Sequence, residues 1–472
     1  MVDRELPLKT LVELADLLRS KKVSPVELVQ VYLERIERVD GKVRAYITVC
    51  GEEALAAAKV AEREILRGID NGPLHGVPVA VKDQFDTQGI LTTMGSLIYS
   101  DYIPQEDATV VARLKQAGAI LLGKLNLTEF AFGDTREYRY GTPRNPWDLD
   151  RSPGMSSAGS GIAVAASLSA GALGEDTGGS VRLPAAMCGV VGLRPTYRRV
   201  SRHGVFPMCW SMDTPGPMTK TVEDCALMLG IIAGHDPKDR ISSTLPVPDY
   251  TCNLGEGVKG MRVGYIREQV EALENDREIQ QAVMRALKVL EGLGARVEPV
   301  SIPLVSLAGP IYIAVCDSDA AGAHETLLRR RARDYDAATR ARLLTASLLP
   351  ATLYHRAQRA RELLRRQMLQ ALEGVEVLVS PVTATPPPTI SETTRPFESE
   401  EDVRVRLFGA RAHTTPYSLA GLPAISIPCG FTSWELPIGL QIGGRAFDEE
   451  TVLRAAAAYQ GATHWHTRRP KV

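Results

Sequence analysis

Lys82 is the first residue along this sequence whose position suggests chemistry. It ends a short apolar run that begins at Gly76, and such a run is typical of a buried strand. Burial lowers the pKa of a lysine toward neutrality, and a neutral lysine can act as a general base. On this segment alone, Lys82 could also form a structural ion pair with Asp83 or another acid.

Two segments rich in glycine and serine follow. The first, from Gly154 to Ser160, carries hydroxyl groups on small-residue backbone, where they could relay protons or bind an anion. In the second, from Glu175 to Arg182, two glycines precede Ser180, so backbone N–H groups can converge on one point as an oxyanion hole. Ser180 would then be the attacking hydroxyl, with lysine replacing histidine as its base. An ordinary capping loop and an ordinary glycine turn are the alternative interpretations.

Other catalytic patterns do not match these segments. No serine lies between glycines in the GxSxG spacing, and the turn before Ser180 lacks the lysine of a phosphate-binding loop. The SxxK pattern is absent around the same serines. The seven cysteines are an odd number without close pairs, and no HExxH pattern occurs. We therefore expect neither a disulfide framework nor a metal site.

Composition describes an ordinary globular chain. Of its 472 residues 44% are hydrophobic and 24% are charged, and 55 basic and 56 acidic residues give a net charge of -1. This balance argues against a nucleic-acid partner or an anionic membrane surface. The N-terminus has no apolar signal core, and we find no run of about twenty apolar residues. A cytoplasmic protein without a membrane partner is the expectation.

Strand-like and helix-like segments alternate along most of the chain, which predicts an α/β fold. We expect a central mixed, mostly parallel, twisted sheet with helices on both faces. No linker divides the chain convincingly. The predicted organisation is a single domain over 1–472, with a helical segment over 1–70, a catalytic core over 76–200 and a more variable substrate-entrance region over 308–413.

The sequence resembles the amidase signature family over essentially its whole length, and the matching segments occur in the family's order. They include the runs around Lys82 and Ser180 and the serine-rich loop between them. In full, the segments are 76–83, 123–131, 145–148, 154–160, 176–182, 184–186, 195–196, 420–428 and 439–442.

This resemblance implies a Ser–cisSer–Lys triad. Ser180 corresponds to the nucleophile, Ser156 to the bridging serine that follows a cis peptide bond, and Lys82 to the base. The implied oxyanion donors are the N–H groups of Thr177, Gly178, Gly179 and Ser180, and the implied supporting or substrate-binding residues are Met155, Ser157, Asp176 and Arg182.

One departure from the family pattern lies in the serine-rich loop. Met155 and Ala158 stand where the family usually has glycine. Because Met155 lies where the cis bond would begin, its side chain could reshape the acyl side of the pocket.

The activity implied by the resemblance is amide hydrolysis through an acyl-enzyme, without metal or organic cofactor. We expect a bulky or aryl amide substrate, with carbamate (urethane) cleavage as a close second, and a homodimer is plausible. The alternative is the glutaminase subunit of a tRNA-dependent amidotransferase, which works with partner chains. Its usual substrate segment reads Glu-Ala-Ser-Ser-Asn-Leu-Ala-Arg-Tyr-Asp-Gly, and the comparable segment here, 316–325, departs from it.

Overall fold

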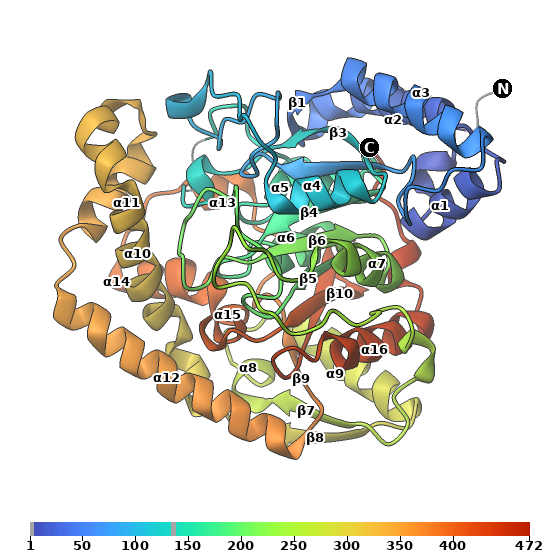
Figure 1. Ribbon diagram of the computed structural model, residues 1–472. Helices are drawn as coiled ribbons and strands as arrows, with labels where there is room; N and C mark the ends of the chain where they lie inside the picture. The colour runs from blue at the N-terminus through green and yellow to red at the C-terminus, as the bar shows by residue number, and fades with distance from the viewer. Residues whose placement is uncertain (1–3, 134–137) are drawn as a thin grey trace.

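One mixed β-sheet runs through the middle of the computed structural model (Figure 1), which describes residues 4–133 and 138–472. Its 11 strands lie in the order β1-β3-β2-β4-β6-β5-β10-β11-β9-β7-β8. Their bounds are β1 Tyr46–Val49, β2 Pro78–Lys82, β3 Ile120–Leu125, β4 Gly171–Glu175, β5 Val191–Arg194, β6 Pro215–Thr219, β7 Arg262–Ile266, β8 Arg296–Val300, β9 Val377–Pro381, β10 Ala424–Phe431 and β11 Pro437–Gly443.

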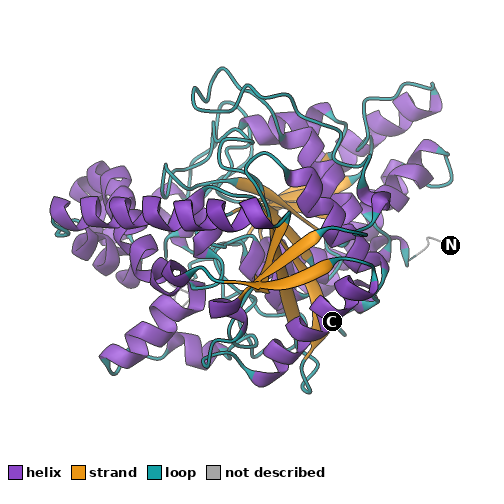
Figure 2. Cartoon of the chain, turned by 90° about the horizontal axis from the view of Figure 1, so that it is seen from below, coloured by secondary structure: helices purple, strands orange, loops and turns teal. Residues whose placement is uncertain are grey.

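Helices pack on both faces of this sheet, as the view from below shows (Figure 2). Most of the apolar core lies between them and the strands. The α-helices are α1 Leu11–Arg19, α2 Pro25–Val43, α3 Gly51–Leu66, α4 Thr109–Gln116, α5 Ala158–Ala165, α6 Arg182–Cys188, α7 Val222–Ile232, α8 Arg267–Val270, α9 Arg277–Gly292, α10 Ala308–Arg331, α11 Ala337–Ala346, α12 Ala351–Gly374, α13 Ile390–Thr394, α14 Glu400–Val403, α15 Thr415–Ala420 and α16 Glu449–Gly461.

The predicted mixed α/β sheet with helices on both faces is confirmed, but its parallel share is smaller than expected. Parallel pairing joins β3 to β2 and β2 to β4 near one end, and β9 to β7 and β7 to β8 at the other. The middle of the sheet, from β4 through β9, is antiparallel. The reason is local, because β10 and β11 form a hairpin and no helix lies between β5 and β6 to carry a parallel crossover.

The described part of the N-terminal segment, residues 4–70, is mostly helical and contains one short strand. Ser24 caps α2 by accepting hydrogen bonds from the N–H groups of Val26 and Glu27, with Pro25 in the first turn. After α2 the chain forms β1, which pairs with β3 at the sheet edge. Four residues are too few for a clear alternating pattern, so the sequence does not predict β1.

The strand that carries Lys82 occupies an interior position in the sheet. All five residues of β2 are buried, and the strand pairs in parallel with β3 on one side and β4 on the other. This agrees with the apolar run in the sequence, because parallel strands are covered on both faces. Lys82 is the last residue of β2, so the amine lies where β2 ends within the sheet.

Within residues 308–413, helices α10, α11 and α12 form a helical flank on one side of the molecule, drawn in gold and orange in Figure 1, whereas β9 belongs to the sheet. Helices α10 and α12 pack against each other, and α15 packs against both. One helical stretch, Pro303–Asp334, has the length and hydropathy of a membrane span, but 56% of its apolar window is buried inside the protein. A core helix of this kind passes the same test.

Small residues let α5 approach the sheet closely. A Cβ atom at Gly159 would lie 2.5 Å from the Ala45 oxygen and 2.5 Å from the Asn126 nitrogen. Because α5 follows directly after Ser157, this close approach fixes where the serine-rich loop meets the sheet.

We predict that Gly159→Ala destabilises the protein by about 1–3 kcal/mol or more, because the added methyl group meets backbone atoms that cannot move aside. The matched control is Gly230→Ala in α7, where no atom lies within 4 Å of the new Cβ. That change should be neutral or should stabilise by up to ~1 kcal/mol, since alanine favours helix. Urea unfolding of both variants measures the difference, and equal midpoints would contradict the account.

Candidate active site

The Lys82 amine is completely buried and contacts the serine-rich loop. Its Nζ atom donates a hydrogen bond to Ser156 Oγ at 2.9 Å. It also lies 3.6 Å from Glu175 Oε2, on a side chain that is equally buried. Asp83, the neighbour considered in the sequence, instead pairs with Lys124 at 3.2 Å. The two segments therefore meet, and Lys82 faces a hydroxyl group and an acid at once.

Burial sets the protonation of this lysine. Desolvation lowers the pKa of Lys82 below its ordinary value, and the nearby Glu175 carboxyl offsets only part of that effect. A lysine whose pKa is lowered spends more of its time as a neutral amine, which can accept a proton. The 2.9 Å contact places Ser156 as the group that would give that proton.

The serine-rich loop is tied to the strand that precedes Ser180. Ser157 Oγ donates to the Glu175 carbonyl oxygen at 3.2 Å and accepts from the Glu175 N–H at 3.3 Å. The next residue, Ala158, begins α5. Ser157 thus joins the loop to the end of β4 through hydrogen bonds to the backbone.

The expected cis peptide bond before Ser156 is wrong. The described residues contain no cis peptide, so Met155 and Ser156 are joined by a trans bond, the form that non-proline residues strongly prefer. The contact between Lys82 and Ser156 is made in this trans form. The hypothesis that Met155 reshapes the acyl side of the pocket loses its basis with the cis bond, and its side chain packs against Leu183, Ala186 and Val382.

Ser180 lies on the turn between β4 and α6, with 8% of its surface exposed. This partial exposure distinguishes it from Ser156, which is 2% exposed. Within residues 4–133 and 138–472, no hydrogen bond joins the Ser156 and Ser180 hydroxyl groups. The structure thus brings the lysine and the loop serine into contact, and the Ser180 hydroxyl lies outside that hydrogen bond.

Several backbone N–H groups in the turn before Ser180 lack an acceptor. In the described chain the N–H groups of Thr177, Gly178 and Ser180 have no hydrogen-bond acceptor. The Gly179 N–H differs, because it donates to Asp176 Oδ1 at 2.8 Å. Three of the four proposed oxyanion donors are therefore available, and Gly179 shapes the turn instead.

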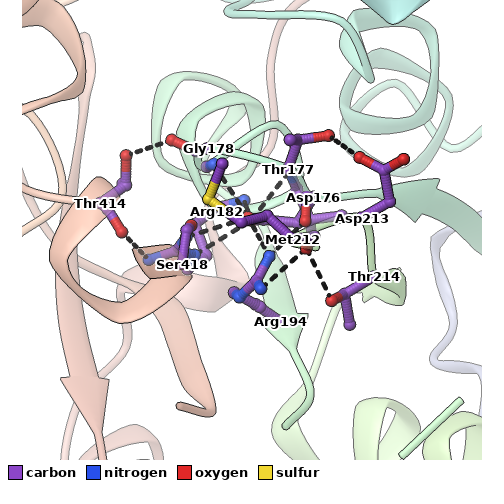
Figure 3. Close-up of polar contacts among 12 residues, drawn as sticks. Asp176, Thr177, Gly178, Arg182, Arg194, Met212, Asp213, Thr214, Thr414 and Ser418 are labelled. Carbon is purple, nitrogen blue, oxygen red and sulfur yellow. Dashed lines mark hydrogen bonds and ion pairs between the residues drawn. The ribbon is translucent and has the colours of Figure 1, made fainter. Parts of the chain in front are cut away.

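A buried carboxylate holds this turn in place (Figure 3). Asp176 accepts hydrogen bonds from Arg182 Nε and Nη2, each at 3.0 Å, and from Arg194 Nη1 at 3.1 Å. All three side chains are fully buried. Burial alone would raise the pKa of Asp176, but the two guanidinium groups outweigh it and hold that pKa well below its usual range.

Arg182 connects the turn to the C-terminal part of the chain. Its Nη1 atom donates to the Thr414 carbonyl oxygen at 2.9 Å and to Gln441 Oε1 at 2.7 Å. Its Nη2 atom donates to Ser418 Oγ at 2.9 Å. Arg182 thus joins the Ser180 turn to α15 and β11, and we infer that it supports the turn rather than contacting substrate.

Two side chains pack on the Ser180 turn, Tyr312 of the helical flank and Thr414 just before α15. A Cβ atom at Gly178 would lie 2.5 Å from the Tyr312 ring, and one at Gly179 would lie 2.3 Å from Thr414 Oγ1. Thr414 Oγ1 also donates to the Gly178 carbonyl oxygen at 2.7 Å. Glycine at both positions is required by this packing, which places Tyr312 of the helical flank beside the candidate site.

Sequence reasoning missed three charged residues of the site. Glu175 lies in the motif that drew attention to Ser180, yet nothing in the sequence assigned it to Lys82. Arg194 and Asp213 lie in separate segments and reach the turn only through the fold: Arg194 binds Asp176, and Asp213 accepts a hydrogen bond from Thr177. The described residues contain no group of His, Cys, Asp or Glu that could hold a metal.

We predict that Asp176→Asn destabilises the protein by about 3–5 kcal/mol, because two buried guanidinium groups lose their counter-charge. The depressed pKa of Asp176 means that its stabilisation is present above the ordinary aspartate pKa of ~3.9 and is lost as the pH falls further. Asp150→Asn is the control, because that side chain is 91% exposed and should change stability by less than ~1 kcal/mol. Chemical unfolding at neutral and acidic pH measures both, and similar losses in the two variants would contradict the prediction.

Comparisons with known proteins agree with this arrangement. The family model described as Amidase matches residues 27–453. A curated relative from Geobacter metallireducens (strain ATCC 53774 / DSM 7210 / GS-15), named as one subunit of a glutamyl-tRNA(Gln) amidotransferase, is 42% identical over 486 residues, which cover 98% of each chain.

Two solved structures are similar over nearly their whole length. One is described as an unexpected vestigial protein complex that reveals the evolutionary origins of an s-triazine catabolic enzyme; it is 32% identical, has a TM-score of 0.89 and is matched over 98% of this chain and 100% of that one. The other, a bacterial aryl acylamidase of the amidase signature family, is 26% identical, has a TM-score of 0.87 and is matched over 97% of each chain. The chain therefore belongs to the amidase signature family of hydrolases that act on carbon–nitrogen bonds.

Proposed function

We propose that this chain hydrolyses an amide by transferring its acyl group first to Ser180 and then to water. The observation that carries the proposal is the buried contact of 2.9 Å between Lys82 Nζ and Ser156 Oγ, below a turn with unpaired N–H groups. A base of lowered pKa, a hydroxyl within its reach and fixed N–H donors are the parts that acyl transfer needs.

The reaction proceeds in two halves. Neutral Lys82 takes a proton from Ser156, which takes one from Ser180 as Ser180 Oγ attacks the amide carbonyl carbon. The N–H groups of Thr177, Gly178 and Ser180 stabilise the negative charge on the carbonyl oxygen. The same relay returns the proton to the leaving nitrogen, the C–N bond breaks, and water then hydrolyses the ester on Ser180.

The relay requires Ser180 Oγ to come within hydrogen-bond reach of Ser156 Oγ when substrate binds. Catalytic hydrogen bonds are often long or poorly aligned before a substrate is bound and tighten in the complex. Ser180 is the more exposed of the two serines, at 8% against 2%. The distance between the hydroxyl groups is therefore expected to shorten in an acyl-enzyme.

Among possible amides, the sequence comparison favours the side-chain amide of glutamine. The curated relative with 42% identity over 98% of both chains is named as part of a glutamyl-tRNA(Gln) amidotransferase. In this proposal the chain releases ammonia from glutamine and works together with partner chains. The homology extends over the full length, so it includes the helical flank as well as the catalytic core.

A bulky or aryl amide is the second candidate, because two observations favour it. The segment 316–325 departs from the substrate segment usual in the glutaminase subunit. The Tyr312 ring also packs directly against Gly178, which places an aromatic surface beside the proposed oxyanion donors. A carbamate would fit the same chemistry, since its carbonyl carbon is open to the same attack.

We predict that Ser180→Ala removes hydrolysis of every substrate that the wild type cleaves. Ammonia release from L-glutamine, with and without amidotransferase partner chains, would be compared with 4-nitroaniline release from an acyl anilide and an aryl carbamate. Ser306→Ala, a change at an exposed serine, is the control and should keep the wild-type rates. Partner-dependent ammonia release supports the glutaminase, whereas anilide cleavage by the chain alone supports the second candidate. Equal rates in wild type and Ser180→Ala would contradict the mechanism.

We predict that activity falls as the pH drops through the lowered pKa of Lys82, because protonation removes the base. Below that pKa the rate should fall about tenfold for each pH unit. Lys82→Ala should lower kcat by about 10²–10⁴-fold at every pH, which is the usual contribution of a general base. Lys115→Ala, whose side chain is 39% exposed, is the matched control. An unchanged rate in Lys82→Ala would exclude this lysine as the base.

A further inference from the structure

A pair of buried carboxyl groups lies behind Lys82, joined by a single hydroxyl group. Thr177 Oγ1 is 2.8 Å from Glu175 Oε1 and 2.7 Å from Asp213 Oδ1 (Figure 3 shows the contact with Asp213). The other oxygen of Glu175, Oε2, faces Lys82 Nζ at 3.6 Å. Glu175 and Thr177 are 0% exposed and Asp213 is 3% exposed, so no solvent separates these groups.

Counting hydrogens shows that this cluster holds an additional proton. A threonine hydroxyl has one hydrogen, so it can donate to only one of two carboxylate oxygens. Its third polar neighbour, Met208 Sδ at 3.6 Å, supplies no hydrogen. With both carboxyls ionised, Thr177 Oγ1 would face either Glu175 Oε1 or Asp213 Oδ1 with no hydrogen between the two oxygen atoms, in a buried site. One carboxyl must therefore be protonated and donate to Thr177, while Thr177 donates to the other.

Backbone donors indicate which carboxyl is ionised. Asp213 accepts hydrogen bonds from the N–H groups of Met208 and Cys209, at distances of 2.9 Å. Glu175 accepts only a long contact of 3.4 Å from the Thr214 N–H, and its Oε2 atom has no hydrogen-bond partner in the described chain. Hydrogen bonds from N–H groups stabilise the charged form of a carboxyl. The negative charge therefore belongs on Asp213 and the proton on Glu175.

The electrostatic surroundings disfavour two charges in this cluster. Burial raises the pKa of both carboxyls, and repulsion between them adds to the rise for Asp213, whose pKa reaches about 7. The other charged groups that face the cluster are Asp176 and its two partners, Arg182 and Arg194. Both arginines are already paired with Asp176. Burial raises the pKa of the Cys209 thiol, which leaves that thiol uncharged.

We propose that Glu175 is held in its protonated, uncharged form by the Thr177–Asp213 pair, and that this keeps the adjacent Lys82 amine neutral and able to accept a proton. Glu175 is then a positioning residue that tunes the base and does not touch the substrate. The inference rests on the proposed function, in which Lys82 is the base. An ionised Glu175 at 3.6 Å would instead stabilise the ammonium form of Lys82 and block the relay.

The first test is the pH dependence of Ser180 labelling by a fluorophosphonate, in which the Oγ–P bond forms, the P–F bond breaks and the serine proton leaves through the base. This reaction needs no knowledge of the natural substrate. In Glu175→Gln the acid limb should stay within about half a pH unit of wild type, because one neutral group replaces another. A shift of the limb by a unit or more to lower pH would show that Glu175 is ionised and would overturn the proposal.

Asp213→Asn provides the complementary test. Without the charge on Asp213, Glu175 loses the neighbour that keeps it protonated, so it should ionise and raise the pKa of Lys82. The acid limb should then move to higher pH by about one to three units, and labelling near pH 7 should slow about tenfold per unit. In the double variant Glu175→Gln/Asp213→Asn the limb should return toward wild type. A purely structural role for Asp213 predicts no such return.

Infrared difference spectroscopy measures the proton directly and does not depend on activity. The spectrum of wild type minus Glu175→Gln at about pH 8 should contain the C=O band of a protonated carboxyl. Ordinary carboxyls are ionised at this pH, so the band would come from Glu175. It should shift in D₂O, because the carboxyl proton is replaced by deuterium. Circular dichroism and thermal melting confirm that each variant is folded. Absence of the band in folded protein would overturn the proposal, whereas failure of labelling with the band present would contradict only the proposed function.

Discussion

The buried ion pairs of Asp176 with Arg182 and Arg194 are the constraint on which the candidate site depends. The carboxylate accepts the Gly179 N–H and so bends the chain into the turn that presents Ser180. The two arginines extend this constraint outward, Arg182 to α15 and β11 and Arg194 to the Met212 carbonyl oxygen. Buried charges of this kind are tolerated only when every partner is in place, so the turn, the central strands and the C-terminal segment must form together.

Much of the site could be predicted because its parts are local in sequence. The run that ends in Lys82 is apolar enough to indicate a buried strand, and β2 ends at that lysine. The glycines before Ser180 indicate a turn with free N–H groups, and such groups are present. Alternating strands and helices indicate the α/β class for the same reason, because hydrophobic periodicity is a property of short segments.

The remainder depends on contacts between distant segments. Asp213 meets Thr177 across 36 positions, and Lys82 meets Glu175 across the β2–β4 pair, so no local pattern revealed either contact. The trans bond before Ser156 departs from the family expectation, and the antiparallel middle of the sheet arises from β10, β11 and the strands beside them. Of these features, the contact with Glu175 bears on the pKa of the lysine, which a motif alone does not specify.

The most direct test of the account is to find which side chain carries the acyl group during turnover. The protein would be quenched with acid while it cleaves a slow ester or anilide substrate, digested and mapped by mass spectrometry. The account predicts an acyl group on Ser180 in wild type and none in Ser180→Ala. An acyl group on Ser156, or turnover with no acylated serine, would contradict the assignment of Ser180 as the nucleophile.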